Sequence, residues 1–198
     1  MIVSLEEAAR RLRGGEVVAY PTETVYALGV DATSAEAVRR VLELKGRDPS
    51  RVLPVLITGL DAVESWVPEL PACAERLARR FWPGPLTLVI GPARRQLATV
   101  ADRGRVGFRC SPHPTAAALA RSTGCPLVAT SCNRSGAPPC RDIHEVENLF
   151  GATFPVAGGA PAGARPPSTV LAVSADGTLE LLREGALSRR ELMECLAA

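Results

Sequence analysis

The sequence predicts a single α/β domain with a twisted, mixed and open sheet flanked by helices. Strand-like and helix-like segments alternate along the chain without an internal repeat. The chain has 198 residues, of which 46% are hydrophobic, so it can fill one sizeable core. No linker-like stretch is long enough to separate two domains. We therefore expect one domain over residues 1–198.

Local signals place the elements of the first half. Ser4-Leu5-Glu6-Glu7 is a capping box that opens a helix, which ends at Gly14-Gly15. A second helix begins after Ser34 and ends at Lys45, because positions 38, 41, 42 and 45 share one face and Gly46 follows. The apolar runs at 16–20 and 53–57 predict strands, and the segments near 60–66 and 71–82 predict helices.

The second half continues the alternation. Trp82-Pro83-Gly84-Pro85 predicts a rigid turn before a strand at 86–90. Ser188 and Glu191 predict the cap of a last helix over 188–197. The Gly/Ala/Pro-rich stretch 158–167 is an irregular segment and a candidate lid. Further strands are expected at 106–109, 126–130, 154–157, 168–173 and 179–183, and further helices near 114–122 and 143–150.

Composition excludes several classes of function. The net charge of +2 carries no polyanion-binding signature, and no apolar run approaches the ~18 residues of a membrane span. The first residues contain no apolar signal-peptide core, so we expect a cytoplasmic protein. None of the six cysteines forms a CxxC pair, and His113 and His144 complete no zinc pattern. We expect no dedicated metal site.

The cation usage is unusual at one position. Of the 23 Lys and Arg residues, Lys45 is the single lysine, and Gly46, Arg47 and Arg51 follow it closely. A cluster of cations with charge-assisted donors suits a polyphosphate. The alternative is a solvated loop. Neither GxxxxGK[ST] nor GxGxxG occurs, so a bound nucleotide would be held by side chains more than by a glycine-rich loop.

Four other segments carry polar side chains next to predicted strands, where α/β folds gather ligand groups. For the segments 21–26 and 130–136, an ordinary turn is the alternative. Ser131 and Cys132 lie in no GxSxG motif, and neither histidine offers a clear base, so nucleophilic catalysis is not favoured. The four segments are 21–26, 105–109, 130–136 with Arg141, and 167–169 with Arg183.

Taken in order, these segments resemble the YrdC/TsaC family, the threonylcarbamoyl-AMP synthases of tRNA modification. The matching pieces span about residues 5–187, which is nearly the whole chain. They are the runs PTETVYALG at 21–29, KGR at 45–47, WPGPLT at 82–87, VGFR at 106–109 with HP at 113–114, TSCNRSG at 130–136, PSTV at 167–170 and LREG at 182–185. The resemblance is to the short, single-domain branch of the family.

The resemblance implies a YrdC-like fold with a basic concave cleft, and an L-threonylcarbamoyladenylate synthase. Such a nucleotidyltransferase makes threonylcarbamoyl-AMP and pyrophosphate from L-threonine, bicarbonate and ATP, for the N6-threonylcarbamoyladenosine modification of tRNA. Mg²⁺ would enter with ATP, and a separate tRNA threonylcarbamoyl transferase complex would use the product.

The resemblance also implies roles for individual residues. Lys45 and Arg47 would be catalytic and would face the phosphates. Thr24, Tyr26, Arg109 and Ser168 would bind threonine or its carbamate. The nucleotide would be bound by Lys45, Arg47, Arg51, Ser131, Asn133, Arg141 and Arg183.

Several positions depart from the family's pattern. Asp48 places an anion beside the expected phosphate cations, and Arg51 stands where Asn or Lys is usual. Leu56 replaces a histidine of the longer relatives, and Arg105 replaces a typical threonine. Cys132 and Ala27 replace other small residues.

Two rival interpretations stay open at this point. One is a carbamoyl-adenylate activity like that of hydrogenase-maturation carbamoyltransferases, whose additional zinc-finger and acylphosphatase-like parts do not fit in 198 residues. The other is a non-catalytic RNA-binding module of the same fold. Such a module would need aromatic side chains interleaved with its arginines. Weak RNA binding by the synthase itself is also left open.

Overall fold

The computed structural model describes residues 1–48, 53–159, 162–163 and 166–197. Helices and strands alternate as expected. The strands form two mixed sheets rather than one. The helices are α1 (Leu5–Arg13), α2 (Ala35–Lys45), α3 (Leu60–Glu64), α4 (Ala72–Phe81), α5 (Pro114–Thr123), α6 (Ile143–Phe150) and α7 (Arg189–Ala197), with a 3-10 helix η1 (Arg95–Val100).

The strands are short, and most pair with partners that are distant in sequence. They are β1 (Ile2–Val3), β2 (Val18–Pro21), β3 (Tyr26–Gly29), β4 (Val55–Leu56), β5 (Leu86–Ile90), β6 (Val106–Arg109), β7 (Leu127–Val128), β8 (Thr130–Ser131), β9 (Val156–Ala157), β10 (Thr169–Val173) and β11 (Leu179–Arg183).

The first sheet has the strand order β1-β9-β2-β3-β8, and the second has the order β11-β10-β5-β6-β4-β7. The single sheet predicted from the sequence is therefore divided in two. The expected strand at 126–130 is the point of division, because β7 belongs to the second sheet and β8 to the first. Ala129 lies between them, so one residue of the chain separates the two sheets there.

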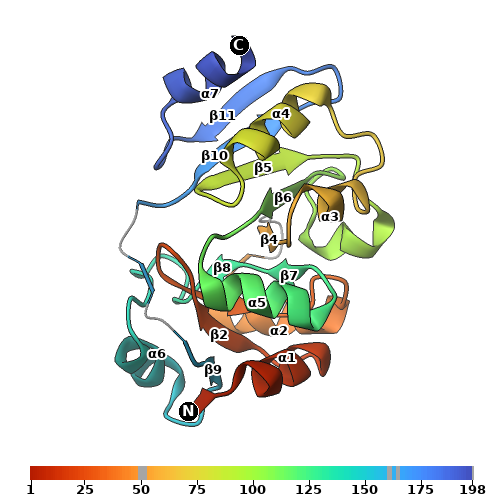
Figure 1. Cartoon of the computed structure of the whole chain (residues 1–198). Helices are drawn as coiled ribbons and strands as arrows, with labels where there is room; N and C mark the ends of the chain where they lie inside the picture. The colour runs from red at the N-terminus through yellow and green to blue at the C-terminus, as the bar shows by residue number, and fades with distance from the viewer. Residues whose placement is uncertain (49–52, 160–161, 164–165, 198) are drawn as a thin grey trace.

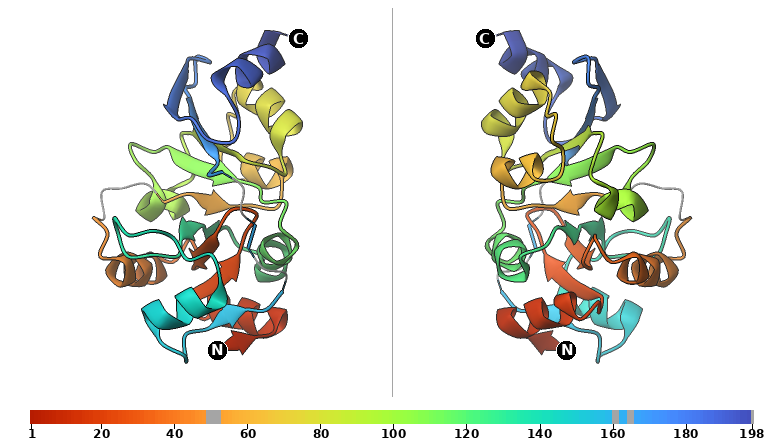
Figure 2. Two further views of the ribbon diagram at one scale, coloured as in Figure 1. Left: turned by 90° about the vertical axis from the view of Figure 1, so that its left-hand side faces the viewer. Right: turned by 90° about the vertical axis from the view of Figure 1, so that its right-hand side faces the viewer.

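Helices cover the two sheets differently (Figures 1 and 2). The first sheet lies between α1 and α5 on one face and α2 and α6 on the other. Ala8, Leu12 and Leu119 pack with Tyr20 of β2 in one buried cluster. On the second sheet, α3, α4 and α7 lie to one side. Its other face carries part of the cavity described below.

Strand β5 shows how the second sheet divides its two faces. All five of its residues are buried, and its bounds are those expected from the sequence. Because side chains alternate along a strand, Leu86, Leu88 and Ile90 point into the core under the helices. Thr87 and Val89 point to the opposite face and line the cavity.

Caps fix the helix boundaries that the sequence predicts. Ser4 and Ser34 accept backbone N–H groups at the starts of α1 and α2. Gly46 ends α2 in the left-handed conformation, with φ of 59°. In the part of the chain that the structure describes, no helix is both long and apolar enough to span a membrane.

Candidate active site

A cavity of about 780 Å³ lies where the two sheets meet. Residues of β2, β3 and β8 from the first sheet line it, together with residues of β5, β6, β10 and β11 from the second. Five arginines and one aspartate are its charged lining residues among the described positions. Hydroxyl groups supply much of the remaining polar lining, from Thr22, Thr24, Thr87, Ser111, Thr130, Ser131 and Ser168.

The structure brings most of the predicted site residues to this cavity. Those that line it are Thr24, Tyr26, Arg47, Arg109, Ser131, Arg141, Ser168 and Arg183. Lys45 and Asn133 do not line it, and Arg51 lies outside the described residues. Leu56 and Arg105, two of the departures from the family's pattern, also face the cavity.

Ser168 is held at the start of β10 by two neighbouring strands. Its hydroxyl hydrogen-bonds the Thr87 hydroxyl of β5 at 2.9 Å. Arg183, at the end of β11, donates from Nη2 to the Ser168 carbonyl at 2.8 Å and to its hydroxyl at 3.3 Å. Burial, followed by the neighbouring Arg109, lowers the pKa of Arg183. Ser168 therefore presents a fixed hydroxyl beside two guanidinium groups.

Arg109, at the end of β6, is an ion-paired and largely buried cation of the cavity. Its side chain is only 13% exposed, and Nη2 donates to Oε1 of Glu23. Oε2 of the same carboxylate accepts from the Ser111 hydroxyl. Glu23 itself is 7% exposed and is not a lining residue of the cavity. The ion pair thus places the cation toward the cavity and the anion behind it.

Lys45 lies beneath the wall of the cavity rather than on its surface. The residue is 2% exposed, and Nζ donates to the carbonyl of Ser131 and to the carbonyl and side-chain oxygens of Asn133, at 2.9 Å and 2.7 Å. Burial, and secondarily Arg47, lowers the pKa of Lys45 from 10.5 to about 8. Lys45 and Asn133 together hold the 131–133 segment, and a phosphate contact by Lys45 stays a prediction.

The segment that follows β8 contains two buried thiols. Cys132 and Cys140 are 0% and 3% exposed, and the Cys140 N–H donates to the Cys132 carbonyl at 2.8 Å. Burial raises the pKa of both thiols. Cys132 therefore packs in the core, as expected for a small residue at this position.

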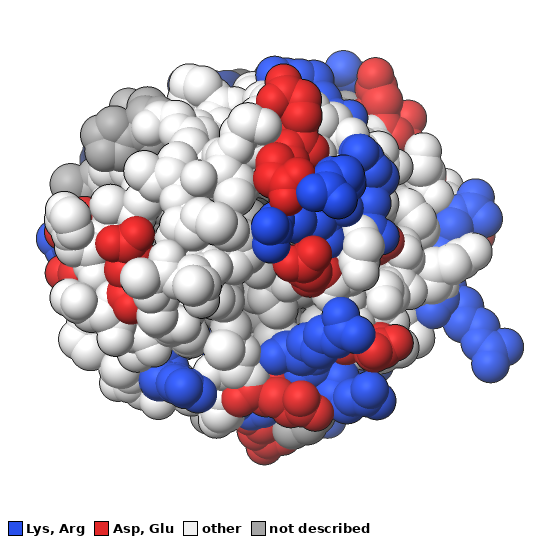
Figure 3. Space-filling model, turned by 90° about the horizontal axis from the view of Figure 1, so that it is seen from below, with Lys and Arg blue, Asp and Glu red and all other residues white. Residues whose placement is uncertain are grey.

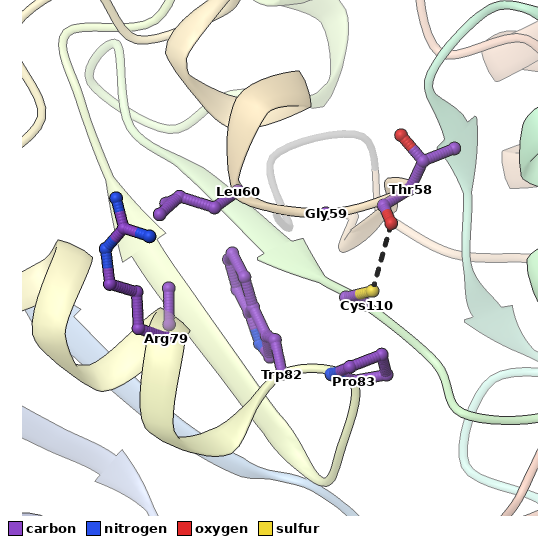
Figure 4. A pocket seen from close by; sticks show the side chains of 8 residues that line it. Thr58, Gly59, Leu60, Arg79, Trp82, Pro83 and Cys110 are labelled. Atoms are coloured by element: carbon purple, nitrogen blue, oxygen red, sulfur yellow. Dashed lines mark hydrogen bonds between the residues drawn. The ribbon is translucent and has the colours of Figure 1, made fainter.

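Another cavity, of about 300 Å³, lies beside the residues that follow β4 and β6 (Figure 4). Cys110 lines it and donates to the Thr58 carbonyl at 3.5 Å. Its charged lining residue is Arg79, which is paired with Glu75 at 2.7 Å. This cavity lacks the converging arginines and hydroxyls of the larger one.

The charged surface at the α1 end of the molecule is mixed in sign (Figure 3). Ion pairs within α1 and α2 join side chains of opposite charge, among them Arg10–Glu7 at 2.5 Å and Arg40–Glu36 at 2.5 Å. The face shown in Figure 3 therefore does not form the continuous basic surface that an RNA-binding module would need there.

Several polar residues that line or support the site were not among those predicted, and three of them bear on how it is built. Glu23 lies within the predicted 21–26 segment, but the sequence gives no sign that its carboxylate is buried against Arg109. Ser111 follows β6 by two residues, and the position of polar groups after strand ends could have indicated it. Thr87 lies within an apolar strand, and only the pairing of β5 with β10 shows its role.

Comparison with known proteins identifies the family. The family model described as telomere recombination, which groups Sua5, YciO and YrdC, matches residues 10–185. The chain belongs to the Sua5/YciO/YrdC family. The resemblance to YrdC/TsaC proteins noted from the sequence is thereby confirmed.

Two curated relatives of this chain are named threonylcarbamoyl-AMP synthase. The threonylcarbamoyl-AMP synthase of Bacillus subtilis strain 168 is 38% identical over 191 residues, which cover 95% of this chain and 55% of that protein. The threonylcarbamoyl-AMP synthase of Thiobacillus denitrificans is 40% identical over 162 residues, which cover 81% of this chain and 86% of that protein. This chain thus spans about half the length of the first relative and most of the second.

Solved structures of the family share the fold. P. abyssi Sua5 complexed with L-threonine superposes with a TM-score of 0.87 at 33% identity, over 99% of this chain and 61% of that protein. E. coli YciO, at 21% identity, superposes with a TM-score of 0.84 over 97% of this chain and 98% of its own, and shows the fold alone.

Proposed function

We propose that this member of the Sua5/YciO/YrdC family is an L-threonylcarbamoyladenylate synthase. The observation that carries the proposal is the cavity between the sheets, which gathers five arginines and several hydroxyls from both sheets. Such a lining suits a nucleoside triphosphate and a second substrate that carries a carboxylate, bound side by side. Relatives named threonylcarbamoyl-AMP synthase, and a relative solved with L-threonine, support the same activity.

The proposed reaction joins three substrates. Protonated bicarbonate loses water to give CO2, and the threonine amine forms a C–N bond with this CO2 and releases a proton, giving a carbamate. A carbamate oxygen then attacks the α-phosphorus of ATP, the bond from that phosphorus to the bridging oxygen breaks, and pyrophosphate leaves. This chemistry needs positioning and charge neutralisation more than a protein nucleophile. The lining residues are suited to those two tasks.

We assign the lining residues to two substrates that bind side by side, with Arg183 beside Ser168 where the two meet. Arg109, Ser168, Thr24 and Tyr26 would bind threonine and its carbamate. Arg47, Ser131, Arg141 and Arg183 would bind the nucleotide, and Lys45 with Asn133 would support Ser131 from behind. We expect Arg105 to contact the nucleotide as well, because it shares the same lining.

ATP would enter as its Mg²⁺ complex. Among the described residues, no group of three or more His, Cys, Asp or Glu could hold a metal ion. We therefore expect the phosphates to supply most of the ligands of the metal. A tRNA threonylcarbamoyl transferase complex is the partner that we propose for the product.

One assay tests the activity. The protein is incubated with ATP, Mg²⁺, bicarbonate and each amino acid in turn, and pyrophosphate and the adenylate product are measured. We expect pyrophosphate release that depends on both threonine and bicarbonate. RNA binding without any threonine-dependent release would contradict the proposal and would favour the non-catalytic RNA-binding module.

A further inference from the structure

Glu23 is a buried carboxylate whose two oxygens are both engaged. Oε1 accepts from Arg109 and Oε2 accepts from Ser111. The side chains of Glu23 and Arg109 are 7% and 13% exposed, so the pair is shielded from water. A buried charge is tolerated only when it is paired and hydrogen-bonded. The direct effect of the Glu23 carboxylate is therefore to pair with the Arg109 guanidinium and to hold it in place.

Arg109 has more donors than its protein partners use. A guanidinium carries five N–H donors in a rigid plane. Within the described part of the chain, the Arg109 side chain hydrogen-bonds Glu23 alone, and its Nε is buried without a hydrogen-bond partner. Arg109 also lines the cavity, whereas Glu23 does not. One edge of the guanidinium is thus held from behind, while other donors remain for a bound anion.

The hold on Arg109 extends to the start of a helix. The Ser111 hydroxyl, which donates to Glu23, also accepts the His113 N–H at 3.2 Å. His113 is the N-cap of α5, and its Nδ1 accepts the Thr115 N–H at 3.3 Å. Because these groups are bonded in series, the position of Glu23 is fixed by the first turn of α5.

We propose that Glu23 and Ser111 are positioning residues, which fix the Arg109 guanidinium to receive the α-carboxylate of the amino acid substrate. This inference rests on the proposed function and deepens it. An unrestrained arginine loses considerable side-chain freedom when it binds a ligand, whereas a fixed one has lost that freedom already. The fixed plane also matches a carboxylate in a bidentate geometry, which a neutral carboxamide cannot reproduce.

The test compares three variants in the synthase assay and by calorimetry. Glu23→Gln keeps the shape and removes the charge, and Ser111→Ala leaves the ion pair but removes its support. We expect the KM for threonine to rise about tenfold in Glu23→Gln and about threefold in Ser111→Ala, with the KM for ATP changed less than about twofold. Glu75→Gln, which removes an exposed ion-paired carboxylate on α4, is the control and should change neither constant.

Calorimetry on the wild-type protein tests the ligand class directly. L-threonine should bind at least about tenfold more tightly than L-threoninamide, and Glu23→Gln should reduce that ratio. If Glu23→Gln fails to fold, Ser111→Ala tests the same positioning, because it removes the hydroxyl that donates to Glu23. Thermal unfolding of each variant separates a loss of positioning from a loss of fold.

The outcomes are distinguishable. Tighter threonine binding in Glu23→Gln would mean that Glu23 only competes with the substrate for Arg109, and it would overturn the proposal. Equal changes in the two KM values, or none, would overturn it as well. If the wild-type protein releases no threonine-dependent pyrophosphate, the proposed function fails. The calorimetric comparison still decides whether Glu23 prepares Arg109 for a carboxylate.

Discussion

The single lysine of the chain supports the site from beneath its surface. Three oxygen acceptors surround Nζ of Lys45, from Ser131 and Asn133. An ammonium group has three donors that can rotate to meet such acceptors, whereas a guanidinium is larger and planar. This geometry gives a physical reason for lysine at a position in a chain that otherwise uses arginine.

Replacing Lys45 should destabilise the fold. Lys45→Met keeps much of the side-chain volume but removes the donor that three part-buried acceptors share. Of these, Asn133 Oδ1 also accepts from the Ser131 hydroxyl at 2.7 Å, so the two carbonyls are the acceptors most affected. Since a buried unsatisfied polar group costs about 1–3 kcal/mol, we expect the free energy of unfolding to fall by about 2 kcal/mol or more. Urea denaturation measures this change.

The matched control for Lys45→Met is Arg39→Met on the same helix. Arg39 is 68% exposed, and its ion pair with Glu43 is a surface one. Its loss should change the free energy of unfolding by less than about 0.5 kcal/mol. A Lys45→Met protein as stable as this control would refute the supporting role of Lys45.

The lowered pKa of Lys45 predicts a pH dependence. Its pKa is about 8 in the folded chain and 10.5 in the unfolded chain, so the unfolded chain binds more protons between these values. The pH-dependent part of the contribution of Lys45 to stability therefore increases as the pH rises from about 8 to 10.5. Below about pH 8 both states carry the proton, so this part is absent and only the hydrogen bonds of the ammonium group contribute. The difference in unfolding free energy between wild type and Lys45→Met should be larger at pH 10 than at pH 7.5. A constant difference would contradict the shifted pKa.

At the level of elements, the sequence predicts helix boundaries well where adjacent residues cap the helix. Ser34 and Gly46 delimit α2 as predicted, because capping depends on adjacent residues. Strand β1 was missed because its two residues pair with Val156 and Ala157, far along the chain. Strand β3 lies within PTETVYALG, which carried a ligand motif but no clear alternation of polar and apolar residues.

Gly29 of β3 shows how closely this strand packs. A Cβ at this position would lie 2.7 Å from Cε1 of Tyr20, whose side chain is fully buried. We expect Gly29→Ala to lower the free energy of unfolding by about 1–3 kcal/mol, because the tyrosine ring has little space to move. Differential scanning calorimetry should show a lower Tm for this variant.

Gly59 provides the comparison for Gly29. It has extended backbone, with φ of 164°, and nothing lies within 4 Å of a Cβ built there. Gly59→Ala should therefore shift the Tm much less than Gly29→Ala. Equal shifts would show that the contact with Tyr20 is not the cause.

At the scale of the whole molecule, the sequence predicted the membership of the site better than its construction. Most of the site residues named from the ordered motifs line one cavity. The division into two sheets was not predictable, because it depends on one residue, Ala129, between two short strands with different partners. The buried pairing of Glu23 with Arg109 likewise depends on the approach of β6 to the 21–26 segment, which no local pattern encodes.

Ligand binding should stabilise both sheets together, because both contribute to the lining of the cavity. With threonine and a non-hydrolysable ATP analogue at about 100 times their Kd, each ligand should add about 2.7 kcal/mol to the free energy of unfolding. Amide hydrogen exchange should slow in β3 of the first sheet and in β10 of the second. Slower exchange confined to one sheet would contradict a site shared by both.

The buried cysteine thiols can be used to measure local opening of the structure. Cys132 and Cys140 lie on the segment that carries Ser131, and Cys110 lies at the end of β6, all of them 3% exposed or less. Burial raises the pKa of each of these thiols, so a thiol-specific reagent should label them only when the surrounding structure opens. Following each cysteine by mass spectrometry would time the opening of the two regions separately, without any engineered label.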